Sequence, residues 1–564
     1  MPDLPAATDH ESKDNNNKDI GEHALSVTSS NGQDETKAQV SIGQVLEVQG
    51  NTEFISAATA APLNPWSRTS LQLYLILLTA CLNATASGFD GSIFSTINAM
   101  DQYKAYFHKQ ETGSSTGIIF AIYTIGSMVG ALTTGLIMDM FGRRAGMGIG
   151  SIIIMIGAIV VTAARSEAYL LGGRFVLGLG IALGTSAAPT YAIELAPPQW
   201  RARVTGYYNT FFYSGSILAT GVTYATAKNH TSLAWRLPLG LQCIPPLFIL
   251  LGAFLIPESP RWLCSRGRID DATRILAKYH GGGDPGHPIV QLEIREFEES
   301  IKQGKTRSWW DWRELVHTHN ARWRIGMVTL MSYGSQLSGN SVLTYYLPSM
   351  YTQLGITSTD RRLLLTFANN IVSCAGAVAG SATNDRIGRR TKLWVGSFIL
   401  AGLFAAVTGF SSQFTTKHGA TGAGIALSNA GVAFIFLFGC AYSFVYTPLT
   451  ATYCAEALDN HTRATGMGIH IIMNNTANFY NTYVTAIALK AIAWKYYLVF
   501  VALNLLYGVF WYFLGVETKG RTLEELQEVF DAKWPPRAAL EKKKMLKTDD
   551  GLLGQLDENR TREV

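Results

Sequence analysis

Long apolar stretches, each long enough to cross a membrane as a helix, recur through most of this 564-residue chain. A helix needs about 20 predominantly apolar residues to span the hydrocarbon core of a bilayer. We predict about twelve such spans: Leu71–Ile97, Gly117–Met138, Gly146–Ala163, Tyr169–Pro189, Val204–Ala225, Leu237–Ile256, Ile325–Leu347, Leu363–Ala382, Lys392–Phe410, Ala430–Tyr453, Met467–Leu489 and Tyr496–Gly515.

These spans predict an all-α membrane protein with twelve transmembrane helices in two six-helix halves and a cytosolic helical loop between them. Residues 1–65 are polar and are expected to form a disordered cytosolic tail. The halves are predicted at 66–256 and 325–515, and the tail at 516–564 is expected to be cytosolic. Residues 257–324 mix charged and apolar positions, which predicts short amphipathic helices.

Composition and charge support the prediction of a membrane protein. Only 15% of the residues are charged, compared with about 25% in soluble domains. Arginines gather in the short connections after even-numbered spans, and the positive-inside rule then places both termini in the cytosol of a cell-membrane protein. Among the glycosylation sequons, the one at Asn229 falls on the predicted outer side.

Two motifs repeat between the halves. The first runs from Asp139 to Arg143 and Arg144, and returns from Asp385 to Arg389 and Arg390, an offset of 385 − 139 = 246. The second pairs Glu194 with Arg201, and returns as Glu456 with Arg463, an offset of 456 − 194 = 262. Two six-span repeats are typical of one transporter superfamily. We predict that these residues form ion pairs that close one face and break when it opens; alternatively, the arginines only anchor the topology.

Asp90 lies inside the first span, in Gly88-Phe89-Asp90-Gly91. A carboxylate in hydrocarbon costs at least about 2.5–3.5 kcal/mol on insertion scales, so it normally faces a protein interior and has a partner. Arg174 of the fourth span is predicted at the same depth, roughly 10 Å below the outer edge. We expect the two to form an ion pair that takes part in coupling, unless the pair is static.

Amide side chains cluster on single faces of two later spans. Gln336 and Asn340 are four residues apart on the seventh span, and Asn474, Asn478 and Asn481 follow helical spacing on the eleventh. Amides in an apolar run need hydrogen-bonding partners. A wet cavity for a hydroxyl-rich ligand would supply them, and so would bonds between neighbouring helices.

Several longer strings resemble the sugar porter family of the major facilitator superfamily. They are Gly173-Arg174, Pro189-Thr190-Tyr191, Pro257-Glu258-Ser259-Pro260-Arg261-Trp262-Leu263, Gln336-Leu337-Ser338-Gly339-Asn340 with Tyr345-Tyr346, and Glu517-Thr518-Lys519-Gly520-Arg521-Thr522-Leu523-Glu524-Glu525. Within the family, the chain is most similar to fungal lactose and cellodextrin permeases. The resemblance implies that Asp90 and Arg174 carry the proton switch, and that Asn209, Gln336, Asn340, Tyr345 and the eleventh-span asparagines contact sugar.

The chain departs from the hexose pattern at Asn209, Ser335 and Ala451, where shorter side chains stand. These changes enlarge the expected cavity and favour a disaccharide or glycoside such as lactose or cellobiose. The resulting hypothesis is a monomeric sugar importer in a lipid bilayer, driven by the proton gradient. No cofactor, metal, nucleic acid or enzymatic activity is expected. A sugar sensor or transceptor, and an exporter of a secondary metabolite, remain alternatives.

Overall fold

The computed structural model describes residues 64–540, except 199, 305–312, 385, 415–421, 460–461, 520 and 522, together with 545–547 and 553–555. Nearly all of the predicted N-terminal tail therefore lies outside the described residues. The chain divides into a large body, residues 50–540, and a small unit made of both ends. Within that small unit, β1 (Met545–Lys547) pairs antiparallel with β2 (Leu553–Gln555).

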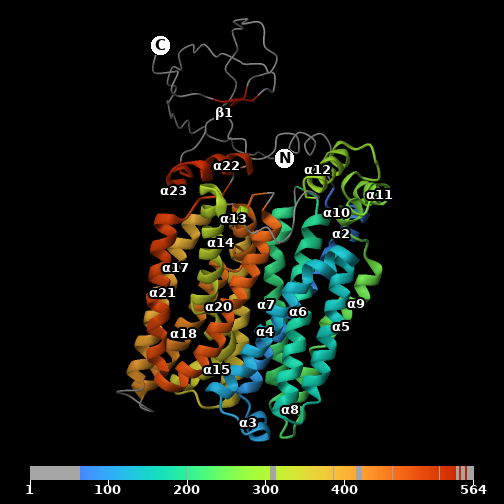
Figure 1. Cartoon of the computed structure of the whole chain (residues 1–564). Coiled ribbons are helices and arrows are strands. Elements are labelled where there is room, and N and C mark those ends of the chain that lie inside the picture. Colours follow the sequence, from blue (N-terminus) through green and yellow to red (C-terminus); the bar gives the residue numbers. More distant parts are fainter. Residues whose placement is uncertain are drawn as a thin grey trace, which may run out of the picture. The chain divides into compact units, whose positions relative to one another are not determined.

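The first half of the body is built from long helices, which Figure 1 shows in blue to green. They are α2 (Arg68–Asn98), α3 (Asp101–Phe107), α4 (Ser114–Phe141), α5 (Arg143–Thr162), α6 (Glu167–Leu195), α7 (Arg201–Thr226), α8 (Leu233–Leu241) and α9 (Ile244–Leu255). Helices α8 and α9 together make one span, broken at Gln242 and Cys243. Pro245 and Pro246 explain the break, because proline lacks the N–H that would continue the hydrogen-bond ladder.

The connecting segment also folds into helices, which we call the linker. They are α10 (Pro260–Ser265), α11 (Ile269–His280), α12 (Pro288–Gly304) and α13 (Glu314–His317). The first three pack around a small apolar core that includes Leu263, Leu276 and Phe297. We call the end of the body that carries the linker the linker end, and the other end, with α3, the opposite end (Figure 1).

The second half repeats the arrangement with α14 (His319–Leu337), α15 (Asn340–Gln353), α16 (Thr359–Ala382), α17 (Arg389–Gln413), α18 (Gly422–Val445), α19 (Thr450–Ala457), α20 (Arg463–Ile492), η2 (Ala493–Tyr496) and α21 (Tyr497–Leu514). Two short helices follow, α22 (Leu523–Asp531) and α23 (Pro535–Ala538). The break between α14 and α15 occurs at Gly339, whose φ of 101° suits glycine.

Nine helical stretches of the described chain are long and apolar enough to cross a membrane, and the last of them contains both α20 and α21. The fifth and seventh spans, α7 and α14–α15, are not among the nine, because they carry many polar side chains. The predicted fold class is confirmed for the body. The five-part division of the chain stays a prediction.

The two halves meet most extensively along three helix pairs: α4 with α20, α7 with α16, and α2 with α15. These six helices therefore define the interface at which a ligand could be enclosed. All six carry predicted site residues or cavity residues, as described below.

Candidate functional site

A buried ion pair lies between α2 and α6. Arg174 Nη1 is 3.3 Å from Asp90 Oδ1, and the two side chains are each only 1% exposed. The structure thus brings together the two residues predicted at matching depth. A pair this dry is held by its own electrostatic attraction and by the groups around it, because water cannot screen it.

The arginine has partners other than the acid. Its Nε donates to the Ile119 carbonyl over 3.3 Å. Its guanidinium carbon lies 4.1 Å from the centre of the Phe94 ring and 4.6 Å from that of Tyr123. Cation–π contacts of this kind contribute about 2 kcal/mol when desolvated. Arg174 therefore remains partly satisfied whatever the charge of Asp90.

A third side chain, not foreseen from the sequence, reaches the acid. Gln242, at the break between α8 and α9, donates from Nε2 to Asp90 Oδ1 over 2.5 Å and is 1% exposed. Tyr123 also lies near the carboxyl group and interacts with it. Within the described residues, however, Asp90 Oδ2 and Gln242 Oε1 have no hydrogen-bonding partner.

A small polar cavity of about 40 Å³ lies between the halves. Its walls come from α2, α7, α15, α16 and α18, and the lining residues are Ser92, Phe212, Tyr213, Ser216, Asn340, Leu343, Thr344, Thr366, Asn369, Asn370, Ser373, Gly439 and Ser443. The lining offers hydroxyls, amides and aromatic faces and contains no charged side chain. Ligand pockets typically enclose about 300–1,000 Å³, so this site is contracted.

The ion pair and the cavity share elements. Ser92, two residues after Asp90, donates to Ser216 Oγ over 2.8 Å at the cavity wall. Tyr345 follows Thr344 on α15 and interacts electrostatically with both Asp90 and Arg174. A change of charge at Asp90 is therefore felt by two of the helices that line the cavity.

Side chains from both halves meet around the cavity. Phe120 of α4 contacts the rings of Tyr345 and Tyr346, with ring centres 5.4 and 5.3 Å apart. The Tyr213 hydroxyl lies 2.5 Å from Ser443 Oγ. Asn209, one helical turn before Tyr213, donates to the Thr447 carbonyl over 3.2 Å. These contacts keep the cavity small.

Of the seven residues predicted to bind substrate, only Asn340 lines the cavity. Asn481 is 1% exposed and donates to the Gln336 carbonyl over 2.8 Å, while its own oxygen accepts from Thr485. Its amide thus joins helices, the alternative that the sequence left open. Asn478 accepts from Ser341 over 3.4 Å, and Asn474 and the Gln336 side chain are half-buried.

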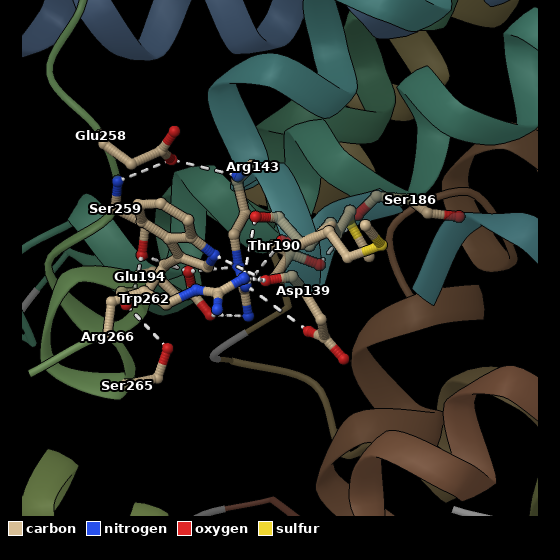
Figure 2. Close-up of polar contacts among 12 residues, drawn as sticks. Asp139, Arg143, Ser186, Thr190, Glu194, Glu258, Ser259, Trp262, Ser265 and Arg266 are labelled. Atoms are coloured by element: carbon tan, nitrogen blue, oxygen red, sulfur yellow. Dashed lines mark hydrogen bonds and ion pairs between the residues drawn. The ribbon is translucent and has the colours of Figure 1, made fainter. Parts of the chain in front are cut away.

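At the linker end, Arg143 joins three segments (Figure 2). Its Nε lies 3.1 Å from Glu194 Oε2, and its Nη1 lies 3.8 Å from Asp139 Oδ1. The Ser259 hydroxyl donates to Glu194 as well. Trp262 Nε1 donates to the Asp139 carbonyl over 3.1 Å, which ties linker helix α10 to the end of α4.

Glu258 caps the start of α5. Its Oε1 accepts from the backbone N–H groups of Arg143 and Arg144 over 3.0 and 3.1 Å. A carboxylate at a helix N-terminus is stabilised by the free N–H groups and the helix dipole. Burial raises the pKa of Glu258, and the backbone N–H groups oppose that rise. Gly142 (φ 94°) leaves room, since a Cβ there would lie 2.4 Å from Glu258 Oε2.

The second half contains the same cluster. Arg389 Nη2 lies 3.2 Å from Glu456 Oε1, and Glu517 accepts from the backbone N–H groups of Arg389 and Arg390 over 2.8 and 3.1 Å. Thr518 donates to Glu456 over 2.6 Å, as Ser259 does to Glu194. The repeat therefore extends to a third pair, Glu258 and Glu517, which the two motifs compared in the sequence did not include.

The side chains of four predicted gating arginines, Arg144, Arg201, Arg390 and Arg463, make contacts other than the predicted ion pairs. Arg201 does not reach Glu194; its Nη2 is 2.5 Å from Glu293 Oε1 of α12. Glu293 also contacts His280, whose second ring nitrogen faces the Leu195 carbonyl at 3.0 Å. Arg463 donates to the Leu458 carbonyl over 3.5 Å. Asp385 lies outside the described residues, and Arg144 Nη1 donates to the Ile256 carbonyl.

An ion pair between the halves, which the sequence did not predict, lies at the opposite end. Arg362 Nη1 lies 2.7 and 2.9 Å from the two Glu111 oxygens. Lys104 also contacts Glu111, at 3.0 Å. Asn229 is exposed at the same end, between α7 and α8. Its predicted glycosylation stays a prediction.

Sequence signals for the missed residues were of unequal strength. Glu258 and Glu517 stood inside the two most specific strings, so a comparison of those strings would have found them. Gln242 is a lone amide in an apolar span, directly before Cys243-Ile244-Pro245-Pro246, and a single amide of this kind is a weak signal. Arg362 has no sequence pattern that marks its partner, which is 251 residues away.

Comparison with known proteins identifies the family. A family model described as "Sugar (and other) transporter" matches residues 76–530, most of the chain. The chain belongs to this family. Its members are membrane transporters rather than enzymes, so this sugar transporter is a multi-pass membrane protein with a small-molecule substrate.

Among curated relatives, the transporter is 28% identical over 470 residues to the high-affinity glucose transporter of Kluyveromyces lactis, covering 81% of this chain and 85% of that one. It is also 28% identical over 490 residues to the MFS glucose transporter mfs1 of Aspergillus flavus, covering 84% and 92%. The relatives thus support the sugar porter family and do not single out lactose or cellodextrin permeases.

Solved structures share the fold. The proton:xylose symporter XylE bound to 6-bromo-6-deoxy-D-glucose superimposes with a TM-score of 0.67 at 24% identity, covering 82% of this chain and 100% of that one. An inward-open structure of XylE from E. coli gives 0.65 at 22% identity, covering 81% and 99%. At this identity the match establishes the twelve-helix fold alone.

Proposed function

We propose that this transporter imports a sugar by proton symport, with alternating access of a central site. One observation carries the proposal: a dry Asp90–Arg174 pair lies beside an uncharged polar cavity at the interface of the halves. A buried acid in a membrane span is costly and is typically retained for ion or proton pathways. The pair gives the cavity a group whose charge can change.

The charge change couples to shape through the two halves. With Asp90 ionised, its pairing with Arg174 stabilises one arrangement of α2 and α6. Proton uptake removes that attraction and changes the free-energy difference between arrangements of these helices. Because α2 and α15 also line the cavity, sugar binding and proton binding then influence each other reciprocally.

The lining of the cavity supports a neutral, hydroxyl-rich substrate. Amides such as Asn340, Asn369 and Asn370 both donate and accept hydrogen bonds, as sugar hydroxyls do. Aromatic rings such as Phe212 and Tyr213 suit the weakly apolar faces of a sugar ring. A sugar needs more than the 40 Å³ present, so binding requires the halves to separate.

For the size of the sugar, we infer a monosaccharide such as glucose, because the curated relatives are named as glucose transporters. A disaccharide or glycoside, such as lactose or cellobiose, is the second candidate. It is favoured by the short side chains of Asn209, Ser335 and Ala451, which leave more room than the longer residues typical of hexose porters.

The linker end is proposed to face the cytosol, with both termini on that side, since it carries the arginine-rich connections. We propose that the Arg143–Glu194 and Arg389–Glu456 ion pairs keep the linker end closed and break when that end opens. The transporter is proposed to act as a monomer and to need no cofactor apart from the proton gradient.

The test is sugar uptake in cells that lack their own sugar transporters, with glucose, xylose, lactose and cellobiose offered separately while the medium pH is recorded. The expected result is uptake of at least one sugar with alkalinisation of the medium. Asp90→Asn should abolish the alkalinisation, while the control Asp270→Asn, an exposed acid on α11, should leave it intact.

Other outcomes assign other functions. Binding of sugar without flux would identify a sensor. Efflux of a non-sugar compound would identify an exporter of a secondary metabolite. Sugar flux in the absence of any proton movement would identify a uniporter and contradict the proposed symport.

A further inference from the structure

Gln242 occupies a position that the proposed symport leaves without a role. The residue lies at the break between α8 and α9, and its side chain is fully buried. It contacts Asp90 rather than the cavity. The break is built into the chain by Pro245 and Pro246, which interrupt the sixth span one turn later. The interruption places an amide within 2.5 Å of a buried carboxylate.

Two buried hydrogen-bond acceptors near Asp90 lack a donor, and one additional proton would supply it. Oδ1 accepts from both Arg174 Nη1 and Gln242 Nε2. Oδ2 of Asp90 and Oε1 of Gln242 are both buried acceptors with no hydrogen-bonding partner of normal geometry among the described residues. The Tyr123 hydroxyl interacts with the Asp90 carboxyl group but not closely enough to satisfy Oδ2. Two unpaired acceptors cannot satisfy each other, and each costs about 1–3 kcal/mol. A single proton on Oδ2 would satisfy both, because the resulting O–H can donate to Oε1.

We propose that Gln242 is the positioning residue that holds protonated Asp90, by forming a two-bond acid–amide pair with it. The inference rests on the proposed function, since it names the state that proton uptake creates. One hydronium ion from the bulk aqueous phase supplies the proton that joins Oδ2 and leaves a water molecule behind; the carboxylate becomes a neutral acid, and Arg174 loses its counter-charge. The Oδ2–H then donates to Gln242 Oε1, while Gln242 Nε2 keeps donating to Oδ1.

The neighbours of the pair are consistent with a change of partner. The titratable and charged groups that face Asp90 are Arg174 from α6, Tyr123 from α4 and Tyr345 from α15. Arg174 retains the Ile119 carbonyl and two aromatic faces after the acid is neutralised. When Asp90 gives up its ion pair with Arg174 and pairs with Gln242 instead, the buried Arg174 guanidinium therefore still has contacts.

The second half provides a matched control. Asn504 of α21 lies 262 residues after Gln242 (504 − 242 = 262), the same offset that separates Glu194 from Glu456. It is a fully buried amide, but it donates to the carbonyls of Ser338 and Phe500 rather than to an acid. Asn504→Leu removes a buried amide as Gln242→Leu does, without touching Asp90.

The experiment is infrared spectroscopy of the purified protein in lipid, titrated with pH, because a protonated carboxyl group gives its own carbonyl band. Asp90→Asn identifies the band. We expect Gln242→Leu to move that band to higher wavenumber, since the acid loses its amide partner, and Asn504→Leu to leave it unchanged. Gln242→Glu should raise the pH of half-protonation by about one unit or more, because two carboxyl groups then share the site.

The infrared measurement needs no sugar flux, so the two proposals fail separately. A band unchanged by Gln242→Leu, or the absence of an Asp90 band at every pH, would overturn the role of Gln242. A band that responds as expected, in a protein that shows no proton-driven accumulation of sugar, would support the acid–amide pair and overturn the symport. If Gln242→Leu fails to fold, the pH shift in Gln242→Glu decides.

Discussion

The ion pair between Arg362 and Glu111 fixes the two halves together at the opposite end, and its removal should open that end. Arg362 lies in the first turn of α16, and Glu111 lies in the connection before α4. The arginine is 3% exposed and contacts both carboxylate oxygens, at 2.7 and 2.9 Å. Arg362→Gln removes the charge while keeping a polar side chain of similar length.

The size of the effect follows from burial. Exposed ion pairs contribute about 0–1 kcal/mol, and breaking a buried pair costs about 3–5 kcal/mol. Glu111 retains 19% exposure and a second cation, Lys104. An intermediate value of about 2 kcal/mol is therefore expected, which changes the ratio of closed to open molecules by about 30-fold.

Pulsed electron–electron double resonance between spin labels at residues 108 and 360 measures the ratio of closed to open molecules. His108 and Asp360 are exposed residues on the two sides of the pair. In the unmodified protein we expect one short distance, and in Arg362→Gln a second, longer one. Arg361→Gln is the control, because Arg361 is exposed on the same helix and, among the residues that the structure describes, hydrogen-bonds to Asn429 alone, at 3.3 Å. Identical distance distributions in all three proteins would refute this reasoning.

Three further changes test other parts of the structure. Gly142→Ala should destabilise the linker end by about 1–3 kcal/mol in thermal unfolding, because alanine is strained at a φ of 94° and its Cβ would displace Glu258; unchanged stability would contradict this. Burial raises the pKa of the Cys264 thiol to about 11, so its maleimide labelling should be about 100-fold slower at pH 7 than that of an ordinary thiol and should accelerate with rising pH; rapid labelling at pH 7 would exclude a closed linker core. Asn340→Ala should raise KM for sugar by about tenfold or more, whereas Asn481→Ala should lower stability by about 1–3 kcal/mol with KM little changed; the reverse pattern in uptake kinetics would reassign the two residues.

The architecture could be predicted from the sequence because the bilayer limits the solutions. Spans of about 20 apolar residues must be helices, since no water is present to pair with the backbone. The repeated arginine motifs then indicated two similar halves. The fifth and seventh spans were found although their polar residues weaken the apolar signal, and those same residues surround the cavity.

The breaks inside spans were harder to foresee. Pro245 and Pro246 indicate an interruption, but the direction in which Gln242 then points depends on how α8 and α9 pack against α2. Gly339 likewise separates α14 from α15. The first break directs Gln242 toward Asp90, and the second determines which side chains of α15 face the interface between the halves. Helical periodicity gives no information about a face once the helix is interrupted.

Asp90 and Arg174 could be paired from the sequence because depth in a membrane is a single coordinate that residue counting supplies. The asparagines could not be sorted in the same way. Asn340 faces the cavity, whereas Asn481 bonds a neighbouring helix, and both satisfy the same spacing rule. Which neighbour a helix face meets is a tertiary property, as the Arg201–Glu293 pair also shows.

The most direct measurement is sugar accumulation in proteoliposomes containing only this transporter, with equal sugar on both sides and an imposed pH gradient. Proton symport predicts that the unmodified protein concentrates sugar on the alkaline side. Asp90→Asn should lose this accumulation but still exchange labelled for unlabelled sugar. Equal accumulation by the Asp90→Asn variant, or no response of the unmodified protein to the gradient, would contradict the coupling of the buried pair to transport.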